Sequence, residues 1–191
     1  MITAIDKNTA LVLIDLQKGI VKIDSVHPMQ GVLEKSALLV DAFRKAGLPI
    51  VVVNTIPSGA GTRNENSAAK NFLRVIASIP DFAEIVDEIK TQPSDIYITK
   101  GTWNAFYNTK LHEELEKRNV TGIVLVGVAT SIGVEGTARA ASELGYNISF
   151  ATDAMTDRVA EAHTNSLQII FPRIGEQGTV SDIIEKLHSR V

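Results

Sequence analysis

The chain has 191 residues, of which 45% are hydrophobic and 21% charged, and its formal net charge at pH 7 is -3. This size and composition exclude a disordered chain and predict one globular domain over residues 1–191. The slightly acidic balance gives no electrostatic reason to expect nucleic acid or an anionic membrane as a partner.

Cysteine is absent from the chain, which excludes disulfides, thiolate metal ligands and a cysteine nucleophile. No two histidines have the i, i+4 spacing of a metal-binding helix, so we expect neither a metal nor a cofactor. The first residues, MITAIDKNTALVLID, lack the basic region and cleavage site of a signal peptide, and the longest apolar runs are too short to cross a membrane. We therefore expect a cytoplasmic protein.

The first half of the chain alternates between strand and helix patterns. The apolar run Ala10–Ile14 predicts a buried strand, Val32–Ala46 follows a helical period that ends at the C-cap candidate Gly47, and Ile50–Val53 predicts a second strand. Asn54–Asn66 is rich in Gly, Ser, Asn and Thr and is predicted as a loop. Within it, Gly59 and Gly61 are plain loop glycines, and the length of the stretch 57–66 is typical of a lid or an interface element.

The second half continues the alternation. Two short segments, residues 71–77 and 82–89, are predicted as helical or mixed. The predicted strands are Ile96–Thr99, Ile123–Val126 and Ile148–Ala151. The predicted helices are Thr109–Arg118, Val134–Leu144, Ala160–Ile170 and Ser181–Leu187, with Ser181 as the N-cap of the last. Strands that alternate with helices predict an α/β fold, a three-layer α/β/α arrangement with a mostly parallel sheet.

Polar residues follow three of these strands. Asp15 follows the first, Lys100 follows the third, and the segment GVATSIG, which ends at Gly133, follows the fourth. Ligands of open α/β sheets bind beyond the carboxyl ends of the strands, so we expect these groups to share one cleft. A carboxylate, an ammonium group and a turn that offers backbone N–H groups can hold a proton and stabilise an oxyanion.

Each of these residues also has a simpler interpretation. Asp15 could cap the segment that follows it, because aspartate is common at strand ends and N-caps. Lys100, considered alone, could be a solvated surface residue. Trp103 and Phe106 either line the cleft or pack the loop after Lys100 onto the core. His163 lies on a predicted helix, where packing or surface exposure is the usual role. GVATSIGVEG matches neither of the glycine-rich nucleotide motifs.

Three segments in order resemble the isochorismatase-like, or cysteine hydrolase, family. They are LVLIDLQ around Asp15, KGTWNAFYNT after Lys100, and GVATSIGVEGTARAA, with a later match at FATDAMTD. The resemblance implies a Rossmann-like six-stranded sheet in the order 3-2-1-4-5-6 and a dimer or larger homo-oligomer. It also implies a cis peptide at Val128–Ala129 and oxyanion donors at Ala129 and Gly133. The further substrate-binding candidates are Gln17, Thr130, Trp103 and Phe106.

The chain departs from the family pattern at the reacting atom. In the cysteine members an aspartate deprotonates a thiol beside a lysine, and the thiolate attacks an amide or imide carbonyl. Gly133 stands at the place of that thiol, so no thioester route exists, and the hydroxyls of Thr130 and Ser131 lie outside that place. The segment VVVNTIPSG lacks the histidine of the nicotinamidase branch, which disfavours that activity and its metal.

Three functional hypotheses follow. The first is a hydrolase that acts non-covalently on a small metabolite, with Asp15 as general acid or base assisted by Lys100. The second is a true isochorismatase, an enzyme that cleaves a vinyl ether to release pyruvate. The resemblance extends to this branch because its members carry a small residue at the position of Gly133. Against it, Ile56 stands where those enzymes place a glutamine, and Arg63 is the only further cation expected near the cleft. The third is a non-catalytic binding or assembly protein.

Overall fold

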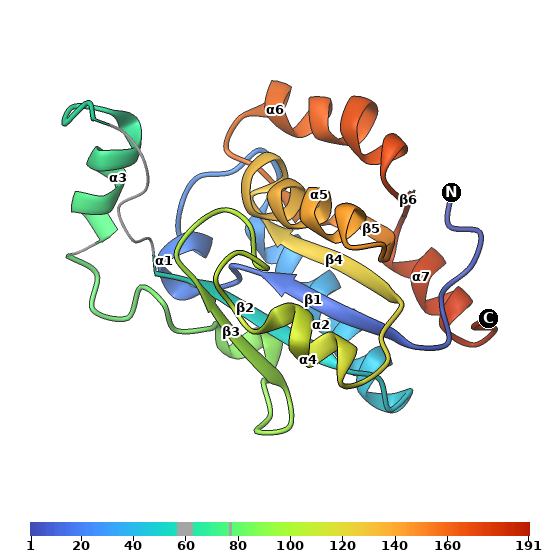
Figure 1. Ribbon diagram of the computed structural model, residues 1–191. Coiled ribbons are helices and arrows are strands. Elements are labelled where there is room, and N and C mark those ends of the chain that lie inside the picture. The colour runs from blue at the N-terminus through green and yellow to red at the C-terminus, as the bar shows by residue number, and fades with distance from the viewer. Residues whose placement is uncertain (57–62, 77) are drawn as a thin grey trace.

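The computed structural model describes residues 1–56, 63–76 and 78–191, and its centre is a six-stranded sheet (Figure 1). The strands are β1 (Thr9–Ile14), β2 (Ile50–Thr55), β3 (Ile96–Lys100), β4 (Gly122–Val128), β5 (Asn147–Thr156) and β6 (Glu176–Gly178). The strand order is β3-β2-β1-β4-β5-β6, and every pairing is parallel. The α/β class and the strand order expected from the sequence are therefore confirmed.

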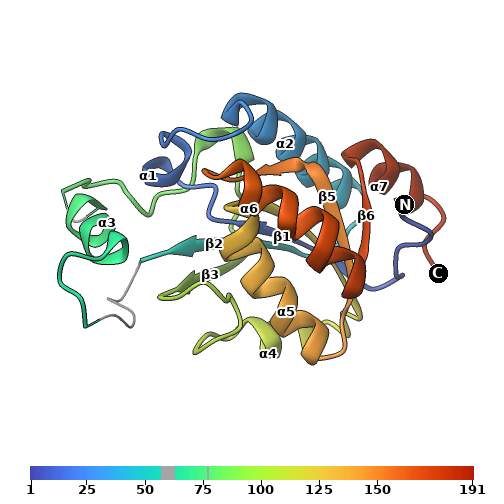
Figure 2. The same ribbon diagram turned by 90° about the horizontal axis from the view of Figure 1, so that it is seen from above.

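Helices cover both faces of the sheet (Figure 2). They are α1 (Lys18–Val21), α2 (Met29–Lys45), α3 (Ala68–Ile76), α4 (Leu111–Glu116), α5 (Glu135–Glu143), α6 (Ala160–Asn165) and α7 (Val180–Leu187). Short 3-10 turns occupy Asp87–Ile89 and Phe171–Arg173, and wider π-helical turns occupy Thr130–Val134 and Ser166–Ile170. In both ribbon views α3 stands apart from the layers that sandwich the sheet.

The alternation of side chains along the strands divides the core in two. Leu11 and Leu13 of β1 point into the cluster formed with α2 and α7. Val12 and Ile14 point into the opposite cluster, which includes side chains from α4 and α5. Both faces of β1 are buried because successive side chains of a strand point to opposite sides. This explains why its sequence is a continuous apolar run.

Several element boundaries differ from the predicted ones. Asn54 and Thr55 belong to β2 and not to the predicted loop, and residues 57–62, with Gly59 and Gly61, lie outside the described residues, as does Ala77. Gly47 has φ 67° directly after the last turn of α2, as expected of a C-cap glycine. Ser181 is not the N-cap of α7: that residue is Thr179, which accepts the N–H of Asp182 in a reciprocal capping box.

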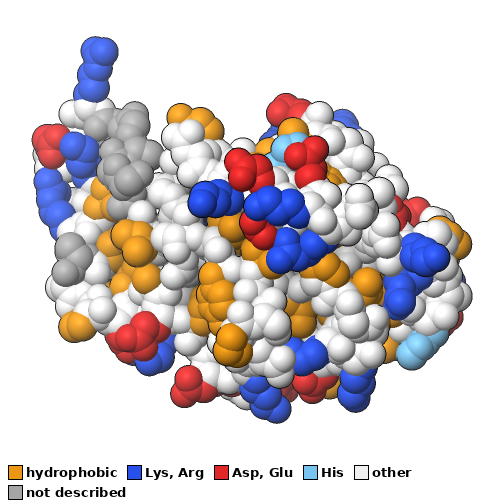
Figure 3. Space-filling view, turned by 60° about the horizontal axis from the view of Figure 1, so that its bottom comes forward, with side chains coloured by type: hydrophobic (Ala, Val, Ile, Leu, Met, Phe, Trp, Pro, Cys, Tyr) orange, Lys and Arg blue, Asp and Glu red, His pale blue; other side chains and the backbone are white. Residues whose placement is uncertain are grey.

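The surface mixes both signs of charge. On the face drawn in Figure 3, Lys and Arg side chains lie among Asp and Glu side chains, with apolar side chains between them. Of the helices in residues 1–56, 63–76 and 78–191, none combines the length and the apolarity needed to cross a bilayer.

Candidate active site

The carboxyl ends of three strands bring Asp15, Lys100 and Gly133 together. Asp15 directly follows β1, Lys100 is the last residue of β3, and Gly133 lies in the turn after β4. Nζ of Lys100 lies 2.7 Å from Oδ2 of Asp15. A Cβ atom placed on Gly133 would lie 3.2 Å from the same oxygen. The predicted convergence of the three residues on one place is therefore confirmed.

The backbone of Asp15 is held in an unusual conformation. Its φ of 54° lies in the left-handed region, which Asp and Asn tolerate better than most residues. Its N–H donates to the carbonyl of Val53 at 3.0 Å, which extends the pairing between β1 and β2 by one residue. The strand thus ends in a sharp, anchored turn that fixes the direction of the carboxylate.

The ion pair is buried, and this sets its proton chemistry. Asp15 is 5% exposed and Lys100 is 2% exposed. Burial raises the pKa of Asp15 to about 6, although the Lys100 ammonium opposes the rise by attraction and by its hydrogen bond. Lys100 also donates to the carbonyl of Thr102 at 3.1 Å. Oδ1 of Asp15 is buried and accepts no hydrogen bond from the residues described. One carboxylate oxygen is therefore held by Lys100, and the other has no hydrogen-bond partner among the described residues.

The segment after β4 forms a wide helical turn beside this pair. The peptide Val128–Ala129 is cis, as the resemblance implies. The carbonyl of Ala129 accepts N–H groups from Ile132 at 3.1 Å and Val134 at 3.2 Å, and the second of these is the i to i+5 bond of a π turn. Such turns occur often at functional sites. The turn carries Gly133 to the side of Asp15.

Two side chains from later in the chain hold this turn in place. Nδ1 of His163, on α6, lies 2.9 Å from the hydroxyl of Thr130. Asp157, just after β5, accepts the N–H of Ser131 at 2.7 Å and its hydroxyl at 2.8 Å. Both hydroxyls that could replace a nucleophile are therefore engaged in positioning the turn.

The sequence did not identify His163 as part of this arrangement. The residue is buried, and its pKa lies below the ordinary value, first because of burial and then because of the neighbouring His27, while Asp157 opposes the shift. Its partner Thr130 lies 33 positions away, a separation that no local motif reveals. The sequence offers only a histidine on a predicted helix, with no indication of the residue that it contacts.

The side chain of Gln17 is held by backbone groups of two other segments. Its amide nitrogen donates to the carbonyls of Thr55 and Phe82 at 3.1 and 2.9 Å, and its oxygen accepts the N–H of Thr55 at 2.7 Å. The side chain is fully buried. Gln17 therefore joins the end of β2 to the segment around Phe82, with both amide N–H groups engaged by backbone carbonyls.

The two aromatic candidates separate. Phe106 stacks on Tyr146 with ring centroids 5.8 Å apart and packs against the core. Tyr146 directly precedes β5, at the edge where the strands begin, so Phe106 belongs to the packing of its loop. Trp103 is 64% exposed, and its Cβ would lie 3.2 Å from a Cβ placed on Gly136 of α5. Trp103 and Tyr107, which is 58% exposed, are the exposed aromatic side chains of this loop.

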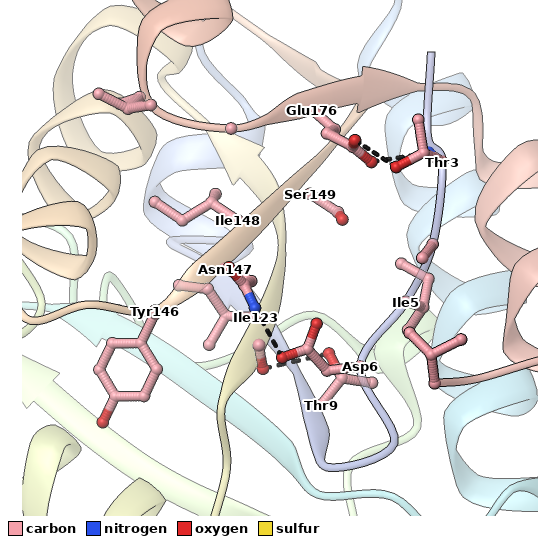
Figure 4. A pocket seen from close by; sticks show the side chains of 15 residues that line it. Thr3, Ile5, Asp6, Thr9, Ile123, Tyr146, Asn147, Ile148, Ser149 and Glu176 are labelled. Carbon is pink, nitrogen blue, oxygen red and sulfur yellow. Dashed lines mark hydrogen bonds between the residues drawn. The ribbon is translucent and has the colours of Figure 1, made fainter.

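A cavity of about 370 Å³ lies at the opposite edge of the sheet, around the first residues of β1, β4 and β5 (Figure 4). Its carboxylates are already bound: Asp6 accepts from Thr121 and Asn147, and Glu176 accepts from Thr3. The two carboxylate side chains of this hollow therefore have structural hydrogen-bond partners. The Asp15–Lys100 pair is buried, whereas this cavity opens to solvent, but the pair is the better candidate for chemistry.

No group of three or more His, Cys, Asp or Glu side chains within the described ranges is arranged to hold a metal ion. The candidate site therefore consists of a carboxylate, an ammonium group and a backbone turn. This set can move a proton and stabilise negative charge.

Residues 9–182 match the family model of the isochorismatase domain. The chain is 41% identical to the isochorismatase family protein YwoC of Bacillus subtilis strain 168, over 95% of both chains. It is 37% identical to the isochorismatase family protein YecD of Escherichia coli O157:H7, over 95% of this chain and 97% of that one. The solved structure of an isochorismatase family protein from Burkholderia thailandensis superposes with a TM-score of 0.87 at 36% identity, over 98% of this chain and all of that one.

Proposed function

The chain belongs to the isochorismatase family, and from this premise we propose that it is a hydrolase that acts on a small metabolite without a covalent intermediate. One observation carries the proposal: Asp15 is buried, is paired with Lys100 through one oxygen, and keeps its other oxygen unpartnered. In this proposal Gly133 stands at the nucleophile position of the cysteine members. Water takes the place of the thiol as the attacking group.

Asp15 acts as a general base in this mechanism. With a pKa of about 6 it is about nine-tenths ionised at pH 7, so its free oxygen can accept a proton from water. The water oxygen forms the new bond to the substrate carbonyl as the proton moves to Asp15. Lys100 stabilises the carboxylate, and the backbone N–H groups of Ala129 and Gly133 are the proposed oxyanion donors. Asp15 then returns the proton to the leaving group.

A second candidate function is the hydrolysis of a vinyl ether, and the same pKa favours it. A carboxyl group that titrates near 6 supplies more of its protonated form at neutral pH than an ordinary aspartate. Protonated Asp15 would donate its proton to the terminal carbon of an enol ether that carries a carboxylate. Water would add to the resulting oxocarbenium ion and lose a proton to the Asp15 carboxylate, and the hemiketal would break down to the alcohol and a keto acid. Lys100 would then stabilise the carboxylate that remains.

The direct test is Asp15→Asn. We expect turnover to fall by about a hundredfold or more, because a general acid–base group contributes on this order, whereas ligand binding should persist. Small amides and isochorismate are assayed side by side, and binding is measured by calorimetry. Asp41→Asn is the matched control, because it makes the same change at an exposed position of α2. Turnover that survives in Asp15→Asn would remove Asp15 from the reaction, and binding without turnover in the wild type would favour a non-catalytic protein.

The pH dependence of kcat/KM separates the two roles of Asp15. A general base is active when ionised, so activity should rise as the pH increases through about 6 and then level off. A general acid is active when protonated, so activity should fall as the pH increases through the same value. We expect the rising profile for amide substrates and the falling profile for vinyl ethers. A profile flat between pH 5 and 7 would show that Asp15 does not titrate in the reaction.

A further inference from the structure

A second cavity, of about 420 Å³, lies between the first turns of α2, the middle of β5 and α6. Its polar lining includes His27, Lys35, Asp153 and His163, and its apolar lining includes Met155 and Leu167. None of Asp15, Lys100 or Gly133 lines it. The volume is in the range that small-molecule sites occupy. The cavity is thus a separate hollow with its own charged groups.

Lys35 is the cationic group of this cavity. Its ammonium lies 2.8 Å from Oδ2 of Asp153. The other oxygen of Asp153, Oδ1, accepts the N–H of Val180 at 2.8 Å. Both oxygens of the acidic side chain are therefore occupied, whereas an ammonium group has three N–H donors and this pair uses one. Lys35 keeps donors for an anion.

His27 offers a second donor. The hydroxyl oxygen of Thr156 accepts the backbone N–H of His27 at 3.1 Å, and it also lies 3.3 Å from Nδ1 of the ring. The hydroxyl proton is then free to be donated to Nδ1, so that the neutral ring carries its own proton on Nε2. Within the described part of the chain, this Nε2 forms no hydrogen bond with another residue. The His163 ring, 4.8 Å from that of His27, already uses its Nδ1 on Thr130.

We propose that this cavity binds a small monocarboxylate with a short apolar body. Lys35 and Nε2–H of His27 donate to the carboxylate, and Met155 and Leu167 contact the apolar part. One cation with capacity to spare and one neutral donor suit a single negative charge better than a phosphate dianion. A metal ion is disfavoured because the described residues contain no group of three suitable ligands.

The site is also joined to the candidate active site through one residue. His163 lines the cavity and hydrogen-bonds to Thr130, the first residue of the turn that carries Gly133. A carboxylate that contacts the His27–His163 pair therefore lies one hydrogen bond from this turn. The bound molecule is an effector of the turn and is distinct from the substrate at Asp15.

The experiment is a titration of the whole chain with butyrate, followed by NMR of the histidine ring signals, which His27→Gln and His163→Gln assign. Butyramide and inorganic phosphate are the comparison ligands. We expect butyrate to shift the His27 and His163 signals saturably, and Lys35→Met to weaken the affinity by about tenfold or more, the factor that about 1.4 kcal/mol produces. Lys45→Met, the same change at an exposed residue of the same helix, should leave the affinity unchanged.

Several results would overturn the proposal. Equal affinity for butyramide would show that the carboxylate is not recognised, and tighter binding of phosphate would replace the carboxylate with another anion. Equal weakening by Lys45→Met would reduce the effect to net charge. The titration is repeated on Asp15→Asn: unchanged binding there supports a separate site, and loss of binding would assign butyrate to Asp15. A result against this cavity leaves the turnover tests of Asp15 unaffected.

Discussion

A methyl group added at Gly133 would contact both the core and the proposed catalytic carboxylate. A Cβ there would lie 2.8 Å from Cγ2 of Ile14 and 3.2 Å from Oδ2 of Asp15. We expect Gly133→Ala to lower the free energy of unfolding by about 1–3 kcal/mol, because overpacking displaces both neighbours. Urea unfolding measures this. Gly31→Ala is the control: nothing lies within 4 Å of its new Cβ, and it should stabilise α2 by about 0.5–1 kcal/mol.

If Gly133→Ala is as stable as the wild type, the turn after β4 is looser than its hydrogen bonds indicate. The turnover of Gly133→Ala, measured in the same preparation, should also be lower than that of the wild type, because the added methyl group occupies space next to the Asp15 carboxylate. A variant that loses stability but keeps full activity would show that the space over Gly133 is not used by the substrate.

The sequence predicted the meeting of Asp15, Lys100 and Gly133 because each lies at or after the end of a predicted strand, and parallel strands end at one edge of a sheet. It did not predict the role of Gln17, whose partners Thr55 and Phe82 lie 38 and 65 positions away. The sequence also left open whether Phe106 lines the cleft or packs on the core, because its partner Tyr146 is distant in the chain. Contacts across long separations depend on how loops pack, and local patterns carry no information about them.

Among the elements, α7 has Thr179 as its N-cap, and not the predicted Ser181. Thr179 accepts the N–H of Asp182, and Asp182 in turn accepts the N–H of Thr179. We expect Thr179→Ala to lower the free energy of unfolding by about 1 kcal/mol, because N–H groups of the first turn lose their acceptor. The control is Ser181→Ala at the position that the sequence favoured. It is exposed and inside the helix, so the change should have little effect.

The opposite result, a larger loss of unfolding free energy for Ser181→Ala than for Thr179→Ala, would indicate that Ser181 is the N-cap of α7. The error has a physical origin: Ser and Thr are both good caps, and two candidates two residues apart cannot be separated without the backbone angles. The same limit explains β6, whose three residues Glu176–Gly178 form no apolar run and were not predicted as a strand. In contrast, β1, β2 and β4 were recognised because they are buried on both faces.

At the scale of the whole molecule, the sheet and its two helical layers enclose the Asp15–Lys100 pair almost completely. Oδ1 of Asp15, the atom that the proposed chemistry needs, is shut off from solvent. Because this oxygen is buried, we expect a ligand to reach it only after the chain opens. Association then has two steps, a unimolecular opening and a bimolecular capture.

This enclosure has a kinetic consequence. In stopped-flow mixing of Asp15→Asn with substrate, followed by the fluorescence of Trp103, the single tryptophan, the observed rate should level off as the substrate concentration rises. A rate that increases linearly to the highest concentration would mean that the pair is directly accessible. With a plateau, the speed of substrate arrival at saturation is a property of the protein's own motion, and further substrate cannot hasten it.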